Sequence, residues 1–342
     1  KSNGNNTDIF SLKAANALGT HFIVPAQTFW SNSTTFSPQP YSSFEIVATE
    51  DGTNVSITPS KAIVGHSAGV SFSIVLNRGQ TYSARATSVL GSDHLYGSEI
   101  TSDKPVAVTI SDDSGYNFFY GGCKDIMGDQ LIPVSVIGNE YIVIKGFFQS
   151  WWGGSLSDKV YITAVKNNTD IFLDGSATAA TTLNKGDQYE VSLSNADLHI
   201  LASEDVYVLH ISGFGCEVGA AVLPALYCTG SEQVSFTRSK NEDFYLLLLV
   251  PSGGQGSFEI NNDKSLISAS DFHSVSSSSG QWKVARIPFS TSEIVTGNNY
   301  IITNSNKLFH AAIINGGSIT GCMYGYFSDF NLVQTDPIFH YN

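Results

Sequence analysis

The sequence predicts an all-β protein, and two observations carry this prediction. Charged residues make up only 14% of the 342 residues, aromatic residues reach 12%, and glycine and small polar residues are plentiful. This balance suits twisted sheets that are joined by polar turns. In addition, three stretches of about 100 residues carry the same strand and turn signals in the same order, as tandem modules do. We therefore expect three β-sandwich-like modules, at residues 9–134, 135–235 and 236–342.

The opening element of each module is a short strand of aromatic and apolar residues. The three expected strands are residues 21–24, 140–143 and 243–246. A glycine, Gly19 or Gly138, stands shortly before each of the first two strands. Short runs of this composition that follow a turn residue are typical of β-strands.

A β-hairpin is the next element that we expect. Residues 44–57 align without a gap on residues 160–173, and each segment alternates apolar and polar residues around a turn signal. The turn signals are Asp51-Gly52 and Asn167-Asn168, which tolerate the positive φ of tight hairpin turns. Residues 257–262 keep a shorter version in the third module.

A second hairpin and a final pair of strands complete each module. We expect the second hairpin at residues 76–82 and 183–189, each with a glycine at the bend. The final strands are expected within residues 100–111, 201–212 and 302–314.

A cysteine that is surrounded by glycines follows the final strands of each module. These residues are Cys123, Cys216 and Cys322. Apolar segments, 129–133 and 221–224, then lead into the next module without a Pro/Ser-rich or charged linker. We therefore expect one rigid body, with the modules in a row or around a pseudo-threefold axis. A β-propeller is the alternative, but the halves of each module do not resemble each other.

Four short motifs resemble the N-terminal domain of the IgGFc-binding protein family, especially its bacterial surface members. The motifs are residues 104–108, Gly122-Cys123, residues 129–134 and residues 138–143. The resemblance extends over nearly the whole chain. It implies a secreted or cell-surface adhesion module, and it makes an immunoglobulin-like protein one of the partners to consider.

The charge argues against a nucleic-acid partner, and the hydropathy argues against a membrane-spanning segment. With 17 basic and 30 acidic residues the net charge is −13, so a nucleic-acid backbone would be repelled. No run of about eighteen apolar residues predicts a membrane span. The polar start, residues 1–8, is typical of a mature N-terminus, so we expect that an export signal has been removed. The expected location is extracellular or at the cell surface.

The motifs for catalysis lack their structural context. Residues 65–69 match a Gly-x-Ser-x-Gly nucleophile elbow, but they lie between predicted hairpins instead of between a strand and a helix. The histidines form no His-Glu-x-x-His motif. We therefore expect no enzymatic activity and no cofactor. A glycan hydrolase is the less favoured alternative, because its two facing carboxylates are brought together by folding and not by sequence spacing.

Two further hypotheses concern a metal ion and a disulfide. Asp112 and Asp113 are weak candidates for calcium ligands. The turn interpretation of residues 112–115 is favoured, because calcium needs six or more oxygens and the sequence shows two carboxylates here. Cys216 and Cys228 are the closest cysteines in the sequence and form the disulfide candidate. Other pairings remain open.

Aromatic residues in polar, glycine-flanked segments are the candidate binding residues. They are Phe29, Trp30, Tyr116, Phe119, Phe148, Trp151 and Trp152. Such rings suit a sugar or an apolar anchor of a partner protein. The competing interpretation, which is favoured, is that they fill the joints between modules.

These observations predict a non-enzymatic adhesion or ligand-binding module. The expected partner is a host glycoprotein, a mucin-type glycan or another protein. The alternative function is a structural spacer within a larger exported protein.

Overall fold

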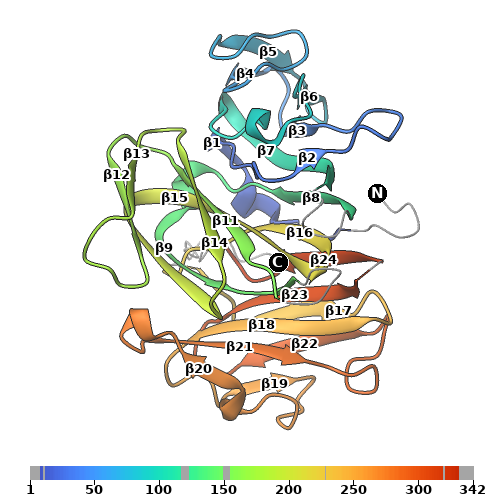
Figure 1. Cartoon of the computed structure of the whole chain (residues 1–342), viewed down its shortest axis with the longest axis vertical. Helices are drawn as coiled ribbons and strands as arrows, with labels where there is room; N and C mark the ends of the chain where they lie inside the picture. Colours follow the sequence, from blue (N-terminus) through green and yellow to red (C-terminus); the bar gives the residue numbers. More distant parts are fainter. Residues whose placement is uncertain are drawn as a thin grey trace, which may run out of the picture.

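The computed structural model describes residues 8–10, 12–116, 123–148, 155–227, 229–318 and 320–330, and these residues form an all-β structure (Figure 1). The all-β prediction is therefore confirmed. The described helices are short 3-10 turns: η1 (Ala14–Ala17), η2 (Gly91–Asp93), η4 (Val134–Val136), η5 (Ala269–Asp271) and η6 (Ser276–Ser278). Among the described residues, no helix has the length and hydropathy needed to cross a membrane.

The first module is one eight-stranded sheet that is organised around a single long strand. Its strands are β1 (Gly19–Ile23), β2 (Ser31–Asn32), β3 (Ser42–Ala48), β4 (Thr53–Thr58), β5 (Phe72–Leu76), β6 (Thr81–Arg85), β7 (Glu99–Tyr116) and β8 (Lys124–Gln130). The order is β5-β4-β7-β3-β6, and β1, β2 and β8 also pair with β7. β7 pairs with β1 and β4 near its start and with β3 and β8 further along.

The second module repeats this strand order, except that β10 is parallel to β15 whereas β2 is antiparallel to β7. Its strands are β9 (Gly138–Ile144), β10 (Phe147–Phe148), β11 (Asp158–Ala164), β12 (Thr169–Leu173), β13 (Thr181–Leu183), β14 (Gln188–Leu193), β15 (Asp197–Gly215) and β16 (Glu217–Val222). The order is β13-β12-β15-β11-β14, with β9, β10 and β16 on β15. The first two modules are thus single curved sheets, which refines the sandwich-like description.

The third module divides the same scheme between two sheets. Its strands are β17 (Gln233–Thr237), β18 (Asp243–Pro251), β19 (Phe258–Ile260), β20 (Phe272–Ser274), β21 (Trp282–Pro288), β22 (Asn299–Asn304), β23 (His310–Gly317) and β24 (Gly321–Tyr326). One sheet has the order β17-β22-β19 and the other β20-β21-β18-β23-β24. The chain leaves the extended conformation between β22 and β23, which correspond to the two parts of the continuous strand β7.

This pairing corrects the alignment of the third module. β17 pairs with β22 as β1 pairs with the start of β7. β18 pairs with β21 and β23, as β3 pairs with β6 and the later part of β7. The opening strand is therefore β17 and not residues 243–246, and the expected boundary after residue 235 falls inside β17. The two strands have similar composition, and only their partners distinguish them.

The predicted hairpins around residues 51–52 and 77–80 are also wrong. β3 and β4 do not pair with each other, because β3 pairs with β6 and β4 with β5. The four strands form one long ribbon, whose actual turn is the loop at residues 59–71. The two expected turns lie opposite each other within this ribbon: Gly52 N–H donates to Asn77 Oδ1 and Arg78 N–H to Asp51 Oδ1, both at 3.0 Å. The positive φ at Gly52 and Gly79 therefore belongs to a bend within the ribbon and not to a hairpin turn.

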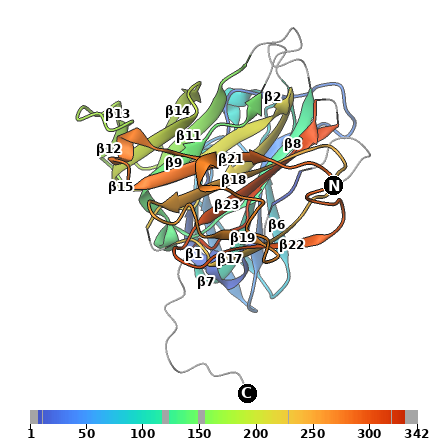
Figure 2. The same ribbon diagram turned by 90° about the horizontal axis from the view of Figure 1, so that it is seen from below.

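The three modules meet at the strands β8, β16 and β24, which Figure 1 shows one below another in the middle of the molecule. One apolar core runs through modules one and two and reaches β18, β21, β23 and β24 of the third module, which also has a second core of its own. Figure 2, seen from below, shows β18, β21 and β23 of the third module side by side. The shared core makes the chain one packed body.

Candidate functional site

Three of the predicted aromatic residues lie at the joint between modules one and two. Trp30 and Phe148 are each 1% exposed, and their ring centroids are 6.3 Å apart. Phe29 lies edge-on to Trp30 at 4.9 Å, and the Lys159 ammonium lies 4.0 Å from the Phe29 ring centroid. The two buried rings are out of reach of a ligand in this conformation, so their geometry favours the joint interpretation.

Tyr116 is the predicted aromatic residue with the largest described exposure. It ends β7, faces Lys124 across the β7–β8 pairing, and is 37% exposed. The Lys124 ammonium lies 5.8 Å from the Tyr116 ring centroid and 5.2 Å from that of Phe36, which is 49% exposed. Lys124 Nζ also donates to Thr35 Oγ1 at 2.8 Å. We call Phe36, Tyr116 and Lys124 the aromatic patch.

The remaining predicted aromatic residues, Phe119, Trp151 and Trp152, lie outside the described residues. Sequence reasoning found Tyr116 but did not select Phe36 or Lys124. Phe36 follows Trp30 in the same aromatic segment, so its sequence context resembles that of the predicted binding residues. Lys124 stands beside Cys123, one of the three glycine-flanked cysteines. Their contact could not be foreseen, because it depends on the strand register.

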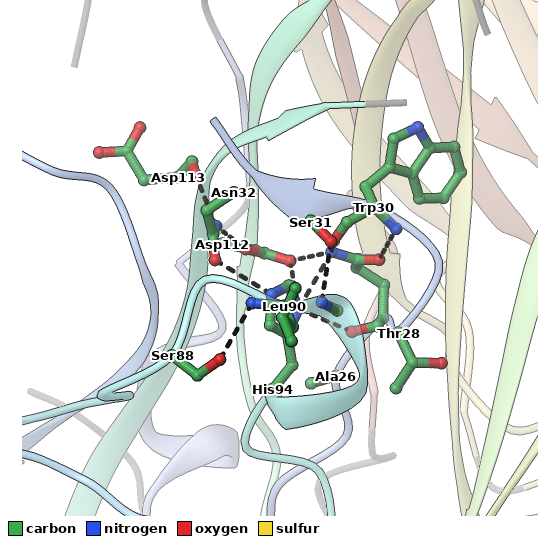
Figure 3. Close-up of polar contacts among 12 residues, drawn as sticks. Ala26, Thr28, Trp30, Ser31, Asn32, Ser88, Leu90, His94, Asp112 and Asp113 are labelled. Atoms are coloured by element: carbon green, nitrogen blue, oxygen red, sulfur yellow. Dashed lines mark hydrogen bonds and ion pairs between the residues drawn. The ribbon is translucent and has the colours of Figure 1, made fainter. Parts of the chain in front are cut away.

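Asp112, one of the two weak calcium ligands, lies at the centre of a buried hydrogen-bond network (Figure 3). Asn32 Nδ2 donates to Asp112 Oδ1 at 2.6 Å, and Gln27 Nε2 donates to Asp112 Oδ2. His94 Nδ1 lies 3.0 Å from the same Oδ2. The Asp113 carboxylate points away from this network in Figure 3. Because the two carboxylates do not converge, the arrangement argues against a calcium site that is built on this pair.

Residues 112–115 do not form the expected turn. They lie within β7, where a β-bulge shifts the β7–β8 register between Asp112 and Gly115. Ser114 has a φ of 53° in this bulge. A β-bulge changes the direction of neighbouring side chains. This bulge directly precedes Tyr116, which belongs to the aromatic patch.

Acceptors face both ring nitrogens of His94, an arrangement that favours the doubly protonated imidazolium, although Gln27 Nε2 also lies 3.1 Å from Nδ1. Nε2 lies 3.0 Å from Asn32 Oδ1, and Nδ1 lies 2.9 Å from the Gln27 carbonyl oxygen as well as close to Asp112. Burial alone would lower the pKa of His94, but the charge and the hydrogen bond of Asp112 outweigh this effect and raise the pKa above 6.5. The imidazolium therefore ties the loop before β2 to η2.

The cavity beside this network is small. It has a volume of about 20 Å³, and its lining includes Gln27, Asp112 and Met127. This space suits about one water molecule and not a substrate. Sequence reasoning missed His94, Gln27 and Asn32 because each is far from Asp112 in the chain.

The disulfide prediction is corrected by the structure. Cys216 is bonded to Cys123, with a Cα–Cα distance of 5.8 Å, and not to Cys228. Cys228 lies outside the described residues, and Cys322 is a buried free thiol. The disulfide connects the residue before β8 of the first module to the residue before β16 of the second. Proximity in sequence favoured the wrong pair, because the packing of β8 against β16 is not visible in the sequence.

A carboxyl pair lies between the same two strands, which bears on the hydrolase alternative. Asp125 and Glu217 share a side-chain hydrogen bond, but they are only 2% and 4% exposed. Burial, and for Asp125 also the adjacent Glu217, raises the pKa of both carboxyls. A polysaccharide cannot reach this pair.

An open polar cleft lies between the second and third modules. Its volume is about 590 Å³, and its lining residues are Asp174, Asn195, Ala196, Asp197, Ser276 and Ser277. Asp174 Oδ1 accepts the His199 backbone N–H at 3.0 Å, and Asp197 Oδ2 lies 2.8 Å from His273 Nε2. These six residues include no aromatic ring, so the cleft offers no ring on which a sugar could stack.

Comparison with known proteins agrees with the resemblance that the motifs suggest. The family described as IgGFc binding protein matches residues 10–325, which is nearly the whole chain. A search of curated proteins found no match. The matched range includes every strand of the three modules up to Gly325 in β24. The chain therefore belongs to the IgGFc-binding protein family.

Proposed function

We propose that this chain is a non-enzymatic extracellular module that binds a glycoprotein partner through the aromatic patch. The observation that carries the proposal is the placement of Phe36 and Tyr116, two exposed rings that share the Lys124 ammonium. Aromatic residues next to a cation are typical of binding hot spots. The family description makes immunoglobulin Fc the first protein to test.

The electrostatics of the chain support an anionic or amphipathic group at this site. The net charge of the chain is −13, and Lys124 places a positive charge between two exposed rings. Lys124 supplies charge, while Phe36 and Tyr116 supply flat apolar faces. A glycan-bearing protein presents both features, because its sugars stack on rings and its acidic groups attract ammonium.

Binding of the purified chain to immobilised Fc, mucin and a glycan array tests the proposal. We expect binding to at least one of these surfaces, and a loss of at least tenfold in affinity for Phe36→Ala/Tyr116→Ala. The matched control is Val75→Ala/Leu201→Ala, which removes two exposed apolar side chains elsewhere. The control should bind as the wild type does.

The opposite result favours a different function. If folded wild-type protein binds none of these surfaces, the spacer function becomes the better account. If binding is unchanged in the patch variant but lost in Ser276→Arg/Ser277→Arg, the polar cleft is the binding site. Thermal unfolding of every variant separates lost binding from lost folding.

A further inference from the structure

A buried lysine contacts a buried carboxyl group, and a second carboxyl group lies nearby, where the N-terminal segment packs on β8. Lys13 Nζ contacts Asp129 Oδ1, and the two side chains are each 3% exposed. The Gly128 N–H, next to Asp129, donates to Asp8 Oδ2 at 3.2 Å. The Lys13 ammonium also lies 4.9 Å from the Phe330 ring centroid. The amine and the Asp129 carboxyl are thus held in contact in an apolar, water-excluded place.

Backbone groups hold both ends of this contact in position. Asp129 Oδ2 accepts the Val222 N–H at 2.8 Å, and Oδ1 accepts the Gln130 N–H at 2.7 Å. The Lys13 backbone N–H donates to Gln130 Oε1 at 2.8 Å. The lysine amine therefore approaches a carboxyl group whose orientation is restricted by β16. A fixed approach of this kind is the main requirement for a reaction between two side chains.

Burial also shifts the protonation of the three groups towards their neutral forms. Loss of hydration lowers the pKa of Lys13, although Asp129 acts in the opposite direction. It raises the pKa of Asp129, and raises that of Asp8 well above its usual value, with a further contribution from the Asp129 charge. A neutral amine next to a protonated carboxyl is the reactive combination, because the lone pair of nitrogen is then free to attack the carbonyl carbon.

We propose that Lys13 and Asp129 join in an intramolecular isopeptide bond between Nζ and Cγ. The neutral amine attacks Cγ and forms the C–N bond. The C–Oδ1 bond then breaks, and Oδ1 leaves as water with the proton of the carboxyl group and one proton of the amine. Oδ2, which the Val222 N–H holds, remains as the amide oxygen. No oxidant, reductant or further reactant is needed.

Asp8 is the group that assists this condensation. Its carboxyl is held by the Gly128 N–H and interacts with the Asp129 charge, so in this proposal the protonated Asp8 would donate a proton towards the leaving oxygen and take up the proton that nitrogen releases. The product is a neutral amide that cannot ionise, so the folded chain no longer has to keep an amine and a carboxyl group away from water. The bond links the segment before β1 covalently to β8, across 116 residues of sequence.

Intact mass spectrometry of the full chain tests this proposal directly. After reduction, alkylation and denaturation, we expect a mass that is one water molecule lower than the sequence mass with its cysteines alkylated. Proteolysis should then yield one branched peptide that contains both Lys13 and Asp129. Because Asp-Gly steps such as Asp51-Gly52 can also lose water by forming a succinimide, fragmentation must place the cross-link on Lys13. The Lys159–Glu190 pair, with N–O at 2.7 Å and Glu190 33% exposed, is the internal control and should remain two linear peptides.

Variants separate the cross-link from a simple ion pair. Lys13→Met should show the full sequence mass, and Asp8→Asn should accumulate the cross-link more slowly or incompletely. An intact mass that equals the sequence mass, with Lys13 recovered in a linear peptide from folded wild-type protein, would overturn the proposal. This result does not depend on the folding of any variant.

Discussion

His21 Nε2 lies 2.8 Å from Glu99 Oε1, and the second module contains the same pair with the two residue types exchanged. There, Glu140 Oε1 lies 2.8 Å from His199 Nε2. The two pairs occupy equivalent positions in their sheets. His21 lies two residues before Ile23, which pairs with Glu99, and Glu140 lies two residues before Ile142, which pairs with His199. The two sheets therefore preserve a histidine–glutamate contact and not the individual residues.

This exchange predicts that the pair in the second module can be reversed. Glu140→His or His199→Glu alone leaves two like groups together in a nearly buried place, so each should destabilise the chain by about 1–3 kcal/mol. The double variant Glu140→His/His199→Glu should recover most of the loss, because it recreates the arrangement of the first module. Urea unfolding of the four proteins measures the coupling. Additive losses in the double variant would show that the exchange is accidental.

The disulfide Cys123–Cys216 should stabilise the joint between modules one and two. It connects residues that are 93 positions apart, so Cys123→Ser/Cys216→Ser should lower the free energy of unfolding by about 4 kcal/mol. The control is Cys322→Ser, which changes the free thiol and leaves the disulfide in place. Reductant should lower the unfolding midpoint of the wild type but not that of the double variant. An unchanged midpoint after verified reduction is the contrary outcome.

A close backbone contact between Gly97 and Gly186 offers a second test of this joint. A Cβ on Gly97 would lie 2.4 Å from the Gly186 carbonyl oxygen. Gly97 and Gly79 have the same φ of 78°, but a Cβ on Gly79 meets no atom within 4 Å. Gly97→Ala should therefore cost about 2 kcal/mol more than Gly79→Ala, which carries the conformational cost alone. Equal losses in thermal unfolding would mean that the modules separate easily here.

The charged state of His94 predicts a pH-dependent stability. Its folded pKa is raised above the unfolded value of 6.5, so its contribution is complete below pH 6.5 and is lost as pH rises through the folded pKa. Urea unfolding of wild type and His94→Gln from about pH 5 to about pH 9 measures the difference. The wild-type advantage should be largest in acid and should shrink as pH rises. A difference that stays constant with pH would show that His94 is neutral in the folded protein.

The all-β class and the order of most strands could be predicted from the sequence, because alternation and turn residues are local signals. The choice of partner strand is not local. Asp51-Gly52 was assigned to a hairpin, but its neighbours β3 and β4 pair with β6 and β5 instead. For the same reason Cys216 was assigned to Cys228 and not to Cys123.

The sequence predicts that aromatic residues form the binding surface, but it does not predict which of them are exposed. Aromatic residues in polar segments indicated a binding surface, and Tyr116 belongs to the exposed patch. Trp30 and Phe148 have the same sequence signal, yet they are buried in the module joint. Exposure depends on how the modules pack, and this information is absent from a local pattern. Lys124 joins the patch only because the bulge in β7 sets the register at Tyr116.

Amide hydrogen exchange tests most directly whether the aromatic patch is the binding site. Exchange is measured with and without a saturating amount of the protein or glycan that binds the chain. The account predicts slower exchange at the aromatic patch, in residues 31–36, 114–116 and 124–126. Slower exchange that is confined to the polar cleft, at residues 174–176, 195–197 and 276–277, would contradict the aromatic patch as the binding site.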